Sequence, residues 1–484
     1  MLSEIWTAVK NEIDEFNQAQ GLPLNPSFAT RQKDIIELID YYWMSKFRQG
    51  ENDSTGYKKA FFNIVENPTL IASKMVDLDT KDIRIIAEEG QSYYPAWFYG
   101  KDLRIWMKDR KNQDGKTFGQ FLNDLVYNWP RYGHLLLKKV LDAIYLVPLH
   151  NIINQQDAKS ILASDLVIEE HDYTIYQLKQ QSWDKKIIDT IIANRPTEKK
   201  IKIYEVHGDC GCSDGHDYHI LPEKAKDEEI LFHHTIDRDD LYRELKWEEV
   251  IGRALGRGNV EKLFENQIAK NANENLFRQG LRWTSKHIFQ TRDQEVAKNL
   301  ISDIENGDIL QVISEVTPIA VEERNLAAYN FADNKWDRNT SDRSFSAQQV
   351  LSGERPPAGT PLGTTIINVQ QASGYYDLKR EDLGLFLKSM LFDWVLPEFE
   401  KQHNKKHSLM LGEFDEDEVA RLRGLVLSNR TNSAIVKFVD KNNYLPSLQE
   451  IQVLKAIKQE ELKHQKEIEL PKGYYDDIKY KIEY

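Results

Sequence analysis

Cysteine is nearly absent from this 484-residue chain, and its two copies, Cys210 and Cys212, fall in one short segment. Such a pair cannot form the framework of cross-links that stabilises small secreted domains, and it is compatible with a reducing compartment. No apolar run approaches the roughly 18 residues that a membrane-spanning helix needs, so we expect no membrane partner. The acidic, amphipathic stretch at residues 1–16 is not typical of a signal peptide.

Motifs with a known catalytic mechanism are also missing. There is no H-E-x-x-H, no Walker A loop, no G-x-G-x-x-G and no G-x-S-x-G. We therefore expect no catalytic residue and no cofactor.

The chain also lacks a net positive charge, since its formal charge is −13. Proteins that bind nucleic acid tightly through its phosphates usually carry a basic surface. The chain therefore either does not bind nucleic acid or contacts it without binding it tightly.

Apolar periodicity predicts an α+β fold that is mainly helical. Steps of three and four residues indicate helices over 1–16, 31–47, 117–140, 259–283 and 378–396. If residues 259–283 form one helix, its length is about 37 Å. Pro397 is expected to end the helix before it, and Ser447 with Glu450 predicts a capping box at the start of the last helix.

Other segments predict strands or loops. Alternation at Ile201 and Ile203 indicates a strand, and a second short strand is expected near residues 218–221. Two aromatic blocks that contain proline, around 93–99 and 128–132, are interpreted as packed loops or short strands. The middle of the chain, about 165–234, is therefore expected to be a small β-rich part on a helical body.

Thiolates and imidazoles, the usual zinc ligands, gather at Cys210, Cys212, His216 and His219. The spacing is not that of a common closed zinc site, and four ligands from so short a span would be cramped. We interpret the segment as a surface hairpin whose polar side chains face water, and we expect no bound metal.

A second polar cluster offers an alternative function. His233 and His234, with Asp237, Asp239 and Asp240, could be drawn as a metal-dependent phosphohydrolase or nuclease site. The spacing matches no motif with a mechanism, so we favour a solvated acidic turn that leads into a helix. The hydrolase stays open as the alternative to a structural role.

The segment at residues 351–363, LSGERPPAGTPLG, cannot continue a helix because it contains three prolines and three glycines. Its only charged residues are Glu354 and Arg355. A nearly neutral loop is one that a moving, highly charged polymer could slide past. An ordinary surface loop competes closely with this interpretation on composition alone.

Three segments resemble the portal proteins of tailed bacteriophages, most closely those of crAss-like phages. They are GRGNVEKLFENQ at 256–267, SGERPPAGTPLGTT at 352–365 and ASGYYDLKREDLGLFLKSMLFDWVLPEF at 372–399, and YEVHGD at 204–209 adds a little. The resemblance implies a head–tail connector: a ring of about twelve subunits around a channel for double-stranded DNA at one capsid vertex. It also implies a place in the virion, with assembly in the host cytoplasm.

The implied partners are further copies of the chain, the DNA in the channel, the terminase large subunit, the major capsid protein and tail adaptors. By order along the chain, the parts of the portal fold would be a wing at 1–255, a first stem helix at 256–283, a clip at 284–325, a second stem helix at 326–350, a tunnel loop at 351–365, a return to the wing at 366–412 and a small helical crown at 413–484.

The resemblance also assigns roles to individual residues. The tunnel loop that faces DNA would include Gly353, Glu354, Arg355, Pro356, Pro357, Gly359 and Thr360. Ring contacts would come from the stem residues Val260, Leu263, Phe264, Ile268 and Leu276. The clip, with eight acidic and four basic residues over 284–324, would be an acidic collar that repels the polymer and centres it.

Overall fold

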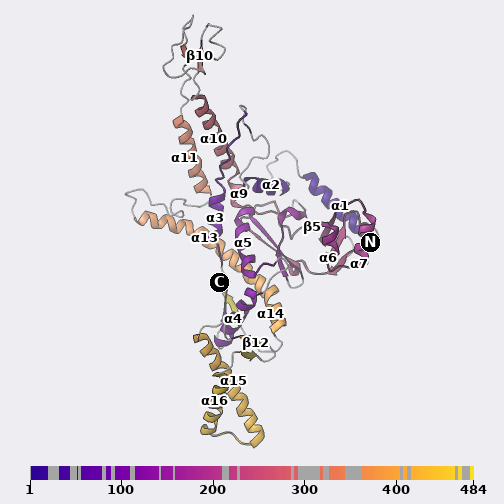
Figure 1. The fold of residues 1–484 in the computed structure, drawn as a ribbon, viewed down its shortest axis with the longest axis vertical. Coiled ribbons are helices and arrows are strands. Elements are labelled where there is room, and N and C mark those ends of the chain that lie inside the picture. The colour runs from indigo at the N-terminus through magenta and orange to yellow at the C-terminus, as the bar shows by residue number, and fades with distance from the viewer. Residues whose placement is uncertain are drawn as a thin grey trace, which may run out of the picture. The chain divides into compact units, whose positions relative to one another are not determined.

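The computed structural model describes residues 2–19, 32–43, 52, 56–78, 83–88, 93–109, 115–140, 143–155, 158–209, 217–225, 229–284, 288–290, 292, 317–319, 326–343, 362–403, 407–410, 416–463, 467–470 and 480–483. They form a mixture of helices and antiparallel strands (Figure 1). None of the helices in these ranges is long and apolar enough to cross a membrane.

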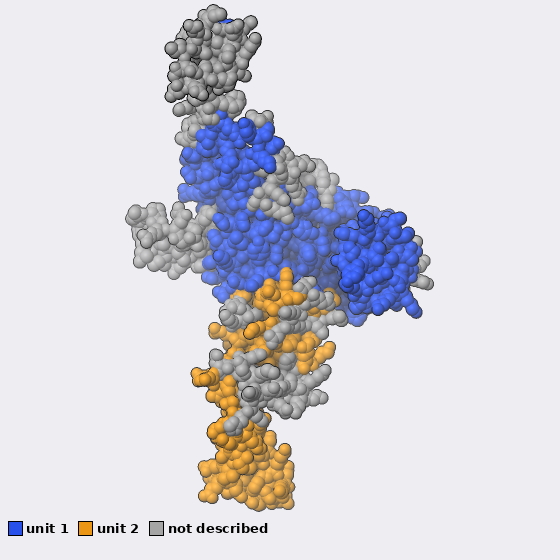
Figure 2. Space-filling view, viewed as in Figure 1, with its two compact units in different colours: residues 1–77, 123–138, 145–383 blue, residues 78–122, 139–144, 384–484 orange. Residues whose placement is uncertain are grey.

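The chain folds into two compact units, shown in Figure 2. Unit 1 comprises residues 1–77, 123–138 and 145–383, and unit 2 comprises residues 78–122, 139–144 and 384–484. Residues 78–122 and 139–144, which fall within the wing predicted over 1–255, belong to unit 2, and the wing assignment stays a prediction. Pairing between segments so far apart in sequence leaves no local pattern from which this division could be inferred.

Unit 1 contains most of the strands and the helices around them. Its elements are α1 (Leu2–Ala19), α2 (Gln32–Trp43), α3 (Glu66–Met75), β4 (Ile152–Asn154), β5 (Leu166–Thr174), α6 (Ile175–Gln180), α7 (Lys185–Asn194), β6 (Lys200–Gly208), β7 (Asp217–Pro222), β8 (Phe232–Thr235), α8 (Arg238–Leu241), β9 (Tyr242–Lys246), α9 (Asn259–Lys262), α10 (Phe264–Thr284), β10 (Ile288–Gln290), β11 (Thr317–Ile319) and α11 (Leu326–Arg343).

Unit 2 is built mainly from helices. Its elements are β1 (Arg84–Ala87), α4 (Tyr93–Asp109), a π-helical turn (Leu391–Val395), α14 (Leu396–His403), β12 (His407–Met410), α15 (Glu416–Asn442), α16 (Leu448–Lys463), β13 (Glu467–Leu470) and β14 (Tyr480–Glu483). Residues of both units occur in α5 (Phe118–Tyr132), β2 (His134–Val140), β3 (Ala143–Leu146) and α13 (Leu362–Met390).

An antiparallel sheet in the order β4-β5-β6-β7-β8 is the centre of unit 1. Successive side chains of a strand point to opposite faces, so Ile201 and Ile203 of β6 enter one buried core while Tyr204 and Val206 enter a second core that α1 covers. The strand predicted from the alternation at 201–206 is confirmed as β6, and the one near 218–221 as β7. A second sheet, β3-β2-β9, follows α5.

Three glycines let two segments of backbone cross in direct contact. Gly133, at φ +75°, joins α5 to β2, and a Cβ there would lie 2.1 Å from the backbone nitrogen of Gly258. A Cβ on Gly256 would lie 2.2 Å from the carbonyl oxygen of Gly133. Any side chain at these positions would push the segments apart. The Gly-Arg-Gly at 256–258 therefore marks the crossing that fixes where α9 begins.

The first long helix predicted over 259–283 is two helices, α9 and α10, which meet at Leu263. Val260 and Leu263 are fully buried in the core of unit 1, and Arg253 makes two hydrogen bonds of 2.7 Å to the carboxylate of Glu261. These contacts hold α9 to the core. Because Leu263 leaves the helical conformation, at φ −99° and ψ 3°, α10 starts afresh at Phe264.

Proline misled the sequence prediction in three places. Residues 93–99 begin helix α4 because Pro95 lies in its first turn, where a missing N–H costs nothing. Helix α5 continues through Pro130, where Trp129 is buried edge-on against Trp247 with ring centroids 4.8 Å apart. Pro397 does not end its helix, since a π-helical turn precedes it and places it at the start of α14.

The C-terminal helices of unit 2 confirm one local prediction. Ser447 and Glu450 form the predicted capping box: the serine N–H donates to the glutamate side chain at 2.8 Å, and the Glu450 N–H donates to the serine hydroxyl at 3.4 Å. Helices α15 and α16 pack against each other (Figure 1). The segment predicted to be a helical crown also contains the strands β13 and β14, which pair with β12 and β1.

Candidate functional site

The residues predicted to face DNA lie outside the described residues. They are Gly353, Glu354, Arg355, Pro356, Pro357, Gly359 and Thr360. The loop predicted over 351–363 is too long at its C-terminal end, because helix α13 already includes Leu362 and Gly363. Almost all of the predicted clip also lies outside the described residues; within it, β10 pairs with β11 in antiparallel register.

The five predicted ring contacts separate into two groups. Val260 and Leu263 are fully buried within unit 1, and Phe264 is partly buried against the same core. The prediction that Val260 and Leu263 contact another subunit is wrong, because the chain's own core encloses both side chains. Ile268 and Leu276 are on α10 and are 55% and 47% exposed, so their apolar surfaces are free to meet a partner.

Helices α10 and α11 run antiparallel, side by side, and β10 lies beyond their ends (Figure 1). Their shared face combines paired polar groups with one aromatic contact, in which the ring centroids of Phe277 and Tyr329 lie 6.0 Å apart. Lys270 of α10 forms ion pairs with Asp333, at 3.4 Å, and with Asp337. Asn266 donates to the Thr340 hydroxyl at 3.3 Å, and both of these side chains are buried. Such paired polar groups fix which residues face each other along the two helices.

Apolar side chains accumulate on the outside of this helix pair instead. Phe331 of α11 is 73% exposed, and Leu281 of α10 joins Ile268 and Leu276 among the exposed large apolar residues. A solvated helix pair would ordinarily carry polar residues at such positions. These exposed side chains form the apolar part of the surface of the helix pair.

The third face of α10 binds an extended segment of the chain through its backbone. The side-chain oxygens of Gln267, Asn271 and Asn275 accept hydrogen bonds from the backbone N–H groups of residues 64, 62 and 60, at 2.8, 2.8 and 2.9 Å. Asn275 also donates to the carbonyl oxygen of residue 60 at 3.1 Å. We call these three residues the amide ladder.

The amide ladder forms because the spacing of its residues along α10 nearly matches the spacing of every second residue along the bound segment. Four residues of helix advance about 6 Å, and two residues of extended chain advance about 6.6 Å. Every fourth helix residue therefore meets every second residue of the segment. Gln267 and Asn271 are almost fully buried, and buried amides of this kind are stable only when they are hydrogen-bonded.

A buried ion cluster connects two sheets, β3-β2-β9 and β4-β5-β6-β7-β8. The ammonium group of Lys138, on β2, lies 2.8 Å from a carboxylate oxygen of Glu169 on β5 and also pairs with Glu205 on β6. Tyr242 donates to Glu169 at 2.5 Å, and Tyr218 donates to Glu205. The Lys138, Glu169 and Glu205 side chains are all nearly inaccessible to solvent.

The protonation of this cluster follows from burial and proximity. Burial alone would lower the pKa of Lys138, but Glu169, followed by Tyr242 and Glu205, raises it well above its usual value. Burial would raise the pKa of Glu169, yet Lys138 and the adjacent His171 lower it to about 2. Burial likewise opposes the charged form of His171, but the hydrogen bond to Glu169 and the charge of Glu205 raise its pKa.

His171 lies 3.3 Å from an oxygen of each glutamate, so the cluster also has the ligand types of a metal site. However, the Lys138 ammonium already bonds to both carboxylates and supplies the positive charge that an ion would bring. The cluster is therefore internally compensated, and its role is to hold the two sheets together.

Of the four residues considered and set aside as zinc ligands in the sequence, only His219 lies within the described residues; Cys210, Cys212 and His216 do not. His219 is buried on β7 and its ring stacks on that of His233, with centroids 4.5 Å apart. These two histidines belong to different clusters along the sequence, and the pairing of β7 with β8 brings them together. Asp217 completes a group of three possible ligands.

The acidic turn of the hydrolase alternative does not form a similar group. Asp237, Asp239 and Asp240 are exposed at the start of α8, and none of them joins either group of possible metal ligands found among the described residues. Arg238, at the same turn, donates to the carbonyl oxygens of residue 162 at 2.7 Å and residue 165 at 3.0 Å. The turn therefore has the geometry of a solvated helix start.

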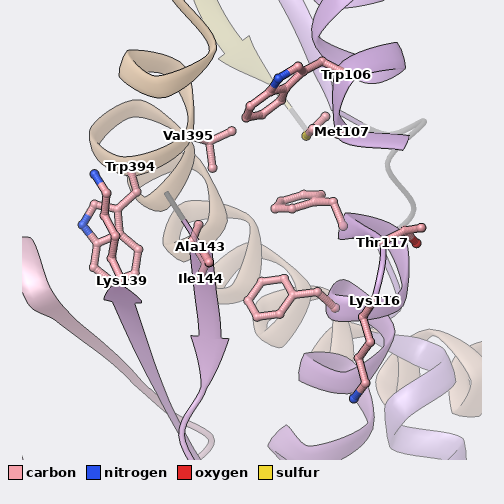
Figure 3. Close-up of a pocket in the computed structure, with 11 residues that line it drawn as sticks. Trp106, Met107, Lys116, Thr117, Lys139, Ala143, Ile144, Trp394 and Val395 are labelled. Carbon is pink, nitrogen blue, oxygen red and sulfur yellow. The ribbon is translucent and has the colours of Figure 1, made fainter. Parts of the chain in front are cut away.

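A small apolar pocket lies within unit 2 (Figure 3). Trp106 and Met107 of α4, Ile144 of β3, and Trp394 and Val395 of the π-helical turn line it. Its volume of about 40 Å³ is enough for a few atoms and far below that of a substrate site. The π-helical turn is what directs Trp394 and Val395 to this position.

The chain was compared with family models, curated proteins and solved structures, and matches occur among the solved structures. No family model matches the chain, and no curated protein is significantly similar to it. Among solved structures, a chain in "Virion of native gene transfer agent (GTA) particle" is 10% identical, with a TM-score of 0.40 over 79% of this chain and 87% of that chain. A chain in "Neck of empty GTA particle computed with C6 symmetry" has the same identity, the same TM-score and 79% and 86% coverage. A TM-score of 0.40 is too low to establish a shared fold.

Proposed function

We propose that this chain is the subunit of a phage portal, a ring at one capsid vertex through which double-stranded DNA enters and leaves. The observation that carries the proposal is the antiparallel pair α10 and α11, which joins a mixed α/β body to a small β pair. It occupies the part of the sequence where the resemblance to portal proteins expects a stem, a clip and a second stem.

The surface of the helix pair supports ring closure. A closed ring needs one face of each subunit to fit a different face of the next. Ile268, Leu276 and Phe331 are exposed apolar residues on the outside of the pair, whereas the face between the two helices is already satisfied by paired polar groups. Burying these residues against the neighbouring subunit would stabilise the ring through the hydrophobic effect.

The charge of the chain supports a passage role rather than tight binding. Each subunit carries a formal charge of −13, and DNA carries about one negative charge per 1.7 Å of its axis. A bore formed by many such subunits repels the polymer, so DNA slides and does not adhere. In this proposal the chain is not an enzyme, and the terminase supplies the ATP hydrolysis. Major capsid protein and tail adaptors dock on its outer surfaces.

Light scattering and negative-stain microscopy of the purified chain test the ring. Rings with a central hole are expected, and Phe331→Asp together with Ile268→Asp should convert them to single subunits. Ile251→Asp is the matched control, because Ile251 is 99% exposed but lies outside the helix pair. A wild-type chain that stays monomeric, above all one that cleaves DNA with a bound metal, would favour the hydrolase alternative.

A deletion of residues 353–359 tests the tunnel loop separately. The ring should still form, because the deletion leaves α10, α11 and α13 intact, while packaging or retention of DNA by assembled heads should fail. Normal DNA packaging by this mutant would contradict the assignment of the tunnel loop and would leave the proposal of a ring unaffected.

A further inference from the structure

We propose that Asp217, His219 and His233 bind one divalent transition ion of the zinc class at the β7–β8 edge of the central sheet. The site belongs to unit 1 alone and is independent of the portal proposal. Two imidazoles and one carboxylate are a common ligand set for such ions. Three protein ligands leave one coordination position of the ion open to water.

Strand pairing explains why these three residues meet. His219 of β7 and His233 of β8 are direct partners in the antiparallel register, and Asp217 lies two residues before His219 on the same strand. Residues that are opposite or two apart share one face of a sheet, so all three side chains are on the same side. One potential ligand atom from each lies within 4.8 Å of the other two.

The contacts of His219 leave its Nε2 atom available to coordinate an ion. Its Nδ1 lies 3.1 Å from the Nδ1 of His233, and its Nε2 lies 3.9 Å from a carboxylate oxygen of Asp217. The side chain is more than nine-tenths buried, and within the described part of the chain its Nε2 has no hydrogen-bond partner. A buried polar atom without a partner is unusual in a folded protein, and it calls for a ligand.

His233 is exposed to solvent, so an ion can reach the three residues from this side. The two rings are nearly parallel, at 16°, so one ring must turn before both nitrogen lone pairs can point at the same ion. His233 is exposed and free to make that rotation, whereas His219 and Asp217 are held by burial. Water from the same side can fill the remaining coordination position.

The site differs from the group of Glu169, His171 and Glu205. There, the ammonium of Lys138 already bonds to both carboxylates. A bound ion at Asp217, His219 and His233 would instead fasten β8 to β7. Strand β8 is a four-residue edge strand with every residue exposed, and it joins the sheet through its pairing with β7.

The experiment is a titration of the full chain, stripped with EDTA, with ZnCl₂ by calorimetry and with CoCl₂ by visible absorption. We expect one ion per chain and the absorption bands of cobalt with nitrogen and oxygen ligands. His233→Ala should weaken binding by at least about 100-fold, because loss of a ligand costs more than loss of its outer partner. His234→Ala is the matched control: it is the adjacent exposed histidine on the opposite face, and it should bind the ion normally.

Two further variants make the outcome decisive. Asp217→Asn should also weaken binding, while Cys210→Ser combined with Cys212→Ser should leave it unchanged. Since His233 is exposed, its alanine variant should keep the wild-type circular dichroism spectrum. Equal binding by wild type and His233→Ala overturns the site. Loss of binding in the double serine variant, with normal binding by His233→Ala, assigns the ion to the cysteines and also overturns it.

Discussion

The buried ion cluster of unit 1 predicts a large difference between two chemically similar substitutions. Lys138→Met removes the only ammonium group beside Glu169 and Glu205 among the described residues, and methionine keeps the length of the apolar stem. Breaking a buried ion pair from one side costs about 3–5 kcal/mol, since the remaining charge stays buried without compensation. Here two carboxylates lose their ammonium partner and keep only His171, so we expect an unfolding free energy lower by about that amount.

Lys202→Met is the matched control. Lys202 on β6 pairs with Glu170 on β5 at 2.7 Å, nearly the same distance and in the same sheet, but both side chains are about one-third exposed. Exposed pairs contribute about 0–1 kcal/mol, so this variant should remain close to wild type. The comparison isolates burial as the cause.

Equilibrium unfolding in urea, followed by tryptophan fluorescence, measures both variants. The packed pair Trp129 and Trp247 lies in unit 1 and reports on its unfolding. Adding Glu205→Gln to Lys138→Met should recover part of the loss, because one uncompensated charge disappears. If the unfolding free energies of Lys138→Met and Lys202→Met differ by less than about 1 kcal/mol, the cluster is not the compensated network described above.

Three other predictions use the same unfolding assay. Asn271→Leu leaves the backbone N–H of Phe62 without its acceptor and should cost about 1–3 kcal/mol; an unchanged midpoint would mean the amide ladder contributes nothing. The pKa of His171 is raised in the folded state, so its contribution to stability is complete below pH 6.5 and is lost as the pH rises through the folded-state pKa. His171→Gln should remove this dependence of the unfolding free energy on pH. A variant that keeps the wild-type dependence would contradict the assignment to His171. Gly258→Ala puts a Cβ within 2.6–2.8 Å of backbone atoms and should destabilise by about 1–3 kcal/mol. Gly374→Ala, in an open helix position, should stabilise by about 0.5–1 kcal/mol, so two shifts of the same sign would refute the crossing argument.

Local patterns in the sequence predicted local structure well. The alternation at Ile201 and Ile203 located β6, and Ser447 with Glu450 located the start of α16. In both cases the deciding forces act between residues a few positions apart. Pro397 misled because the π-helical turn before it has no signature in single-residue propensities.

The candidate site was not predictable in the same way. His219 and His233 belonged to separate clusters along the chain and met only through the pairing of β7 with β8. Val260 and Leu263 carry the apolar spacing of a contact helix, yet periodicity cannot tell a core of the same chain from a neighbouring subunit. Burial, which depends on the whole fold, makes that distinction.

The amide ladder has a consequence for how the chain can diverge. Gln267, Asn271 and Asn275 recognise atoms that every amino acid except proline possesses, so they place few demands on the side chains of residues 60, 62 and 64. Homologous chains should therefore keep the three amides while the bound segment changes freely in composition. Proline at 60, 62 or 64 is the substitution that this arrangement forbids.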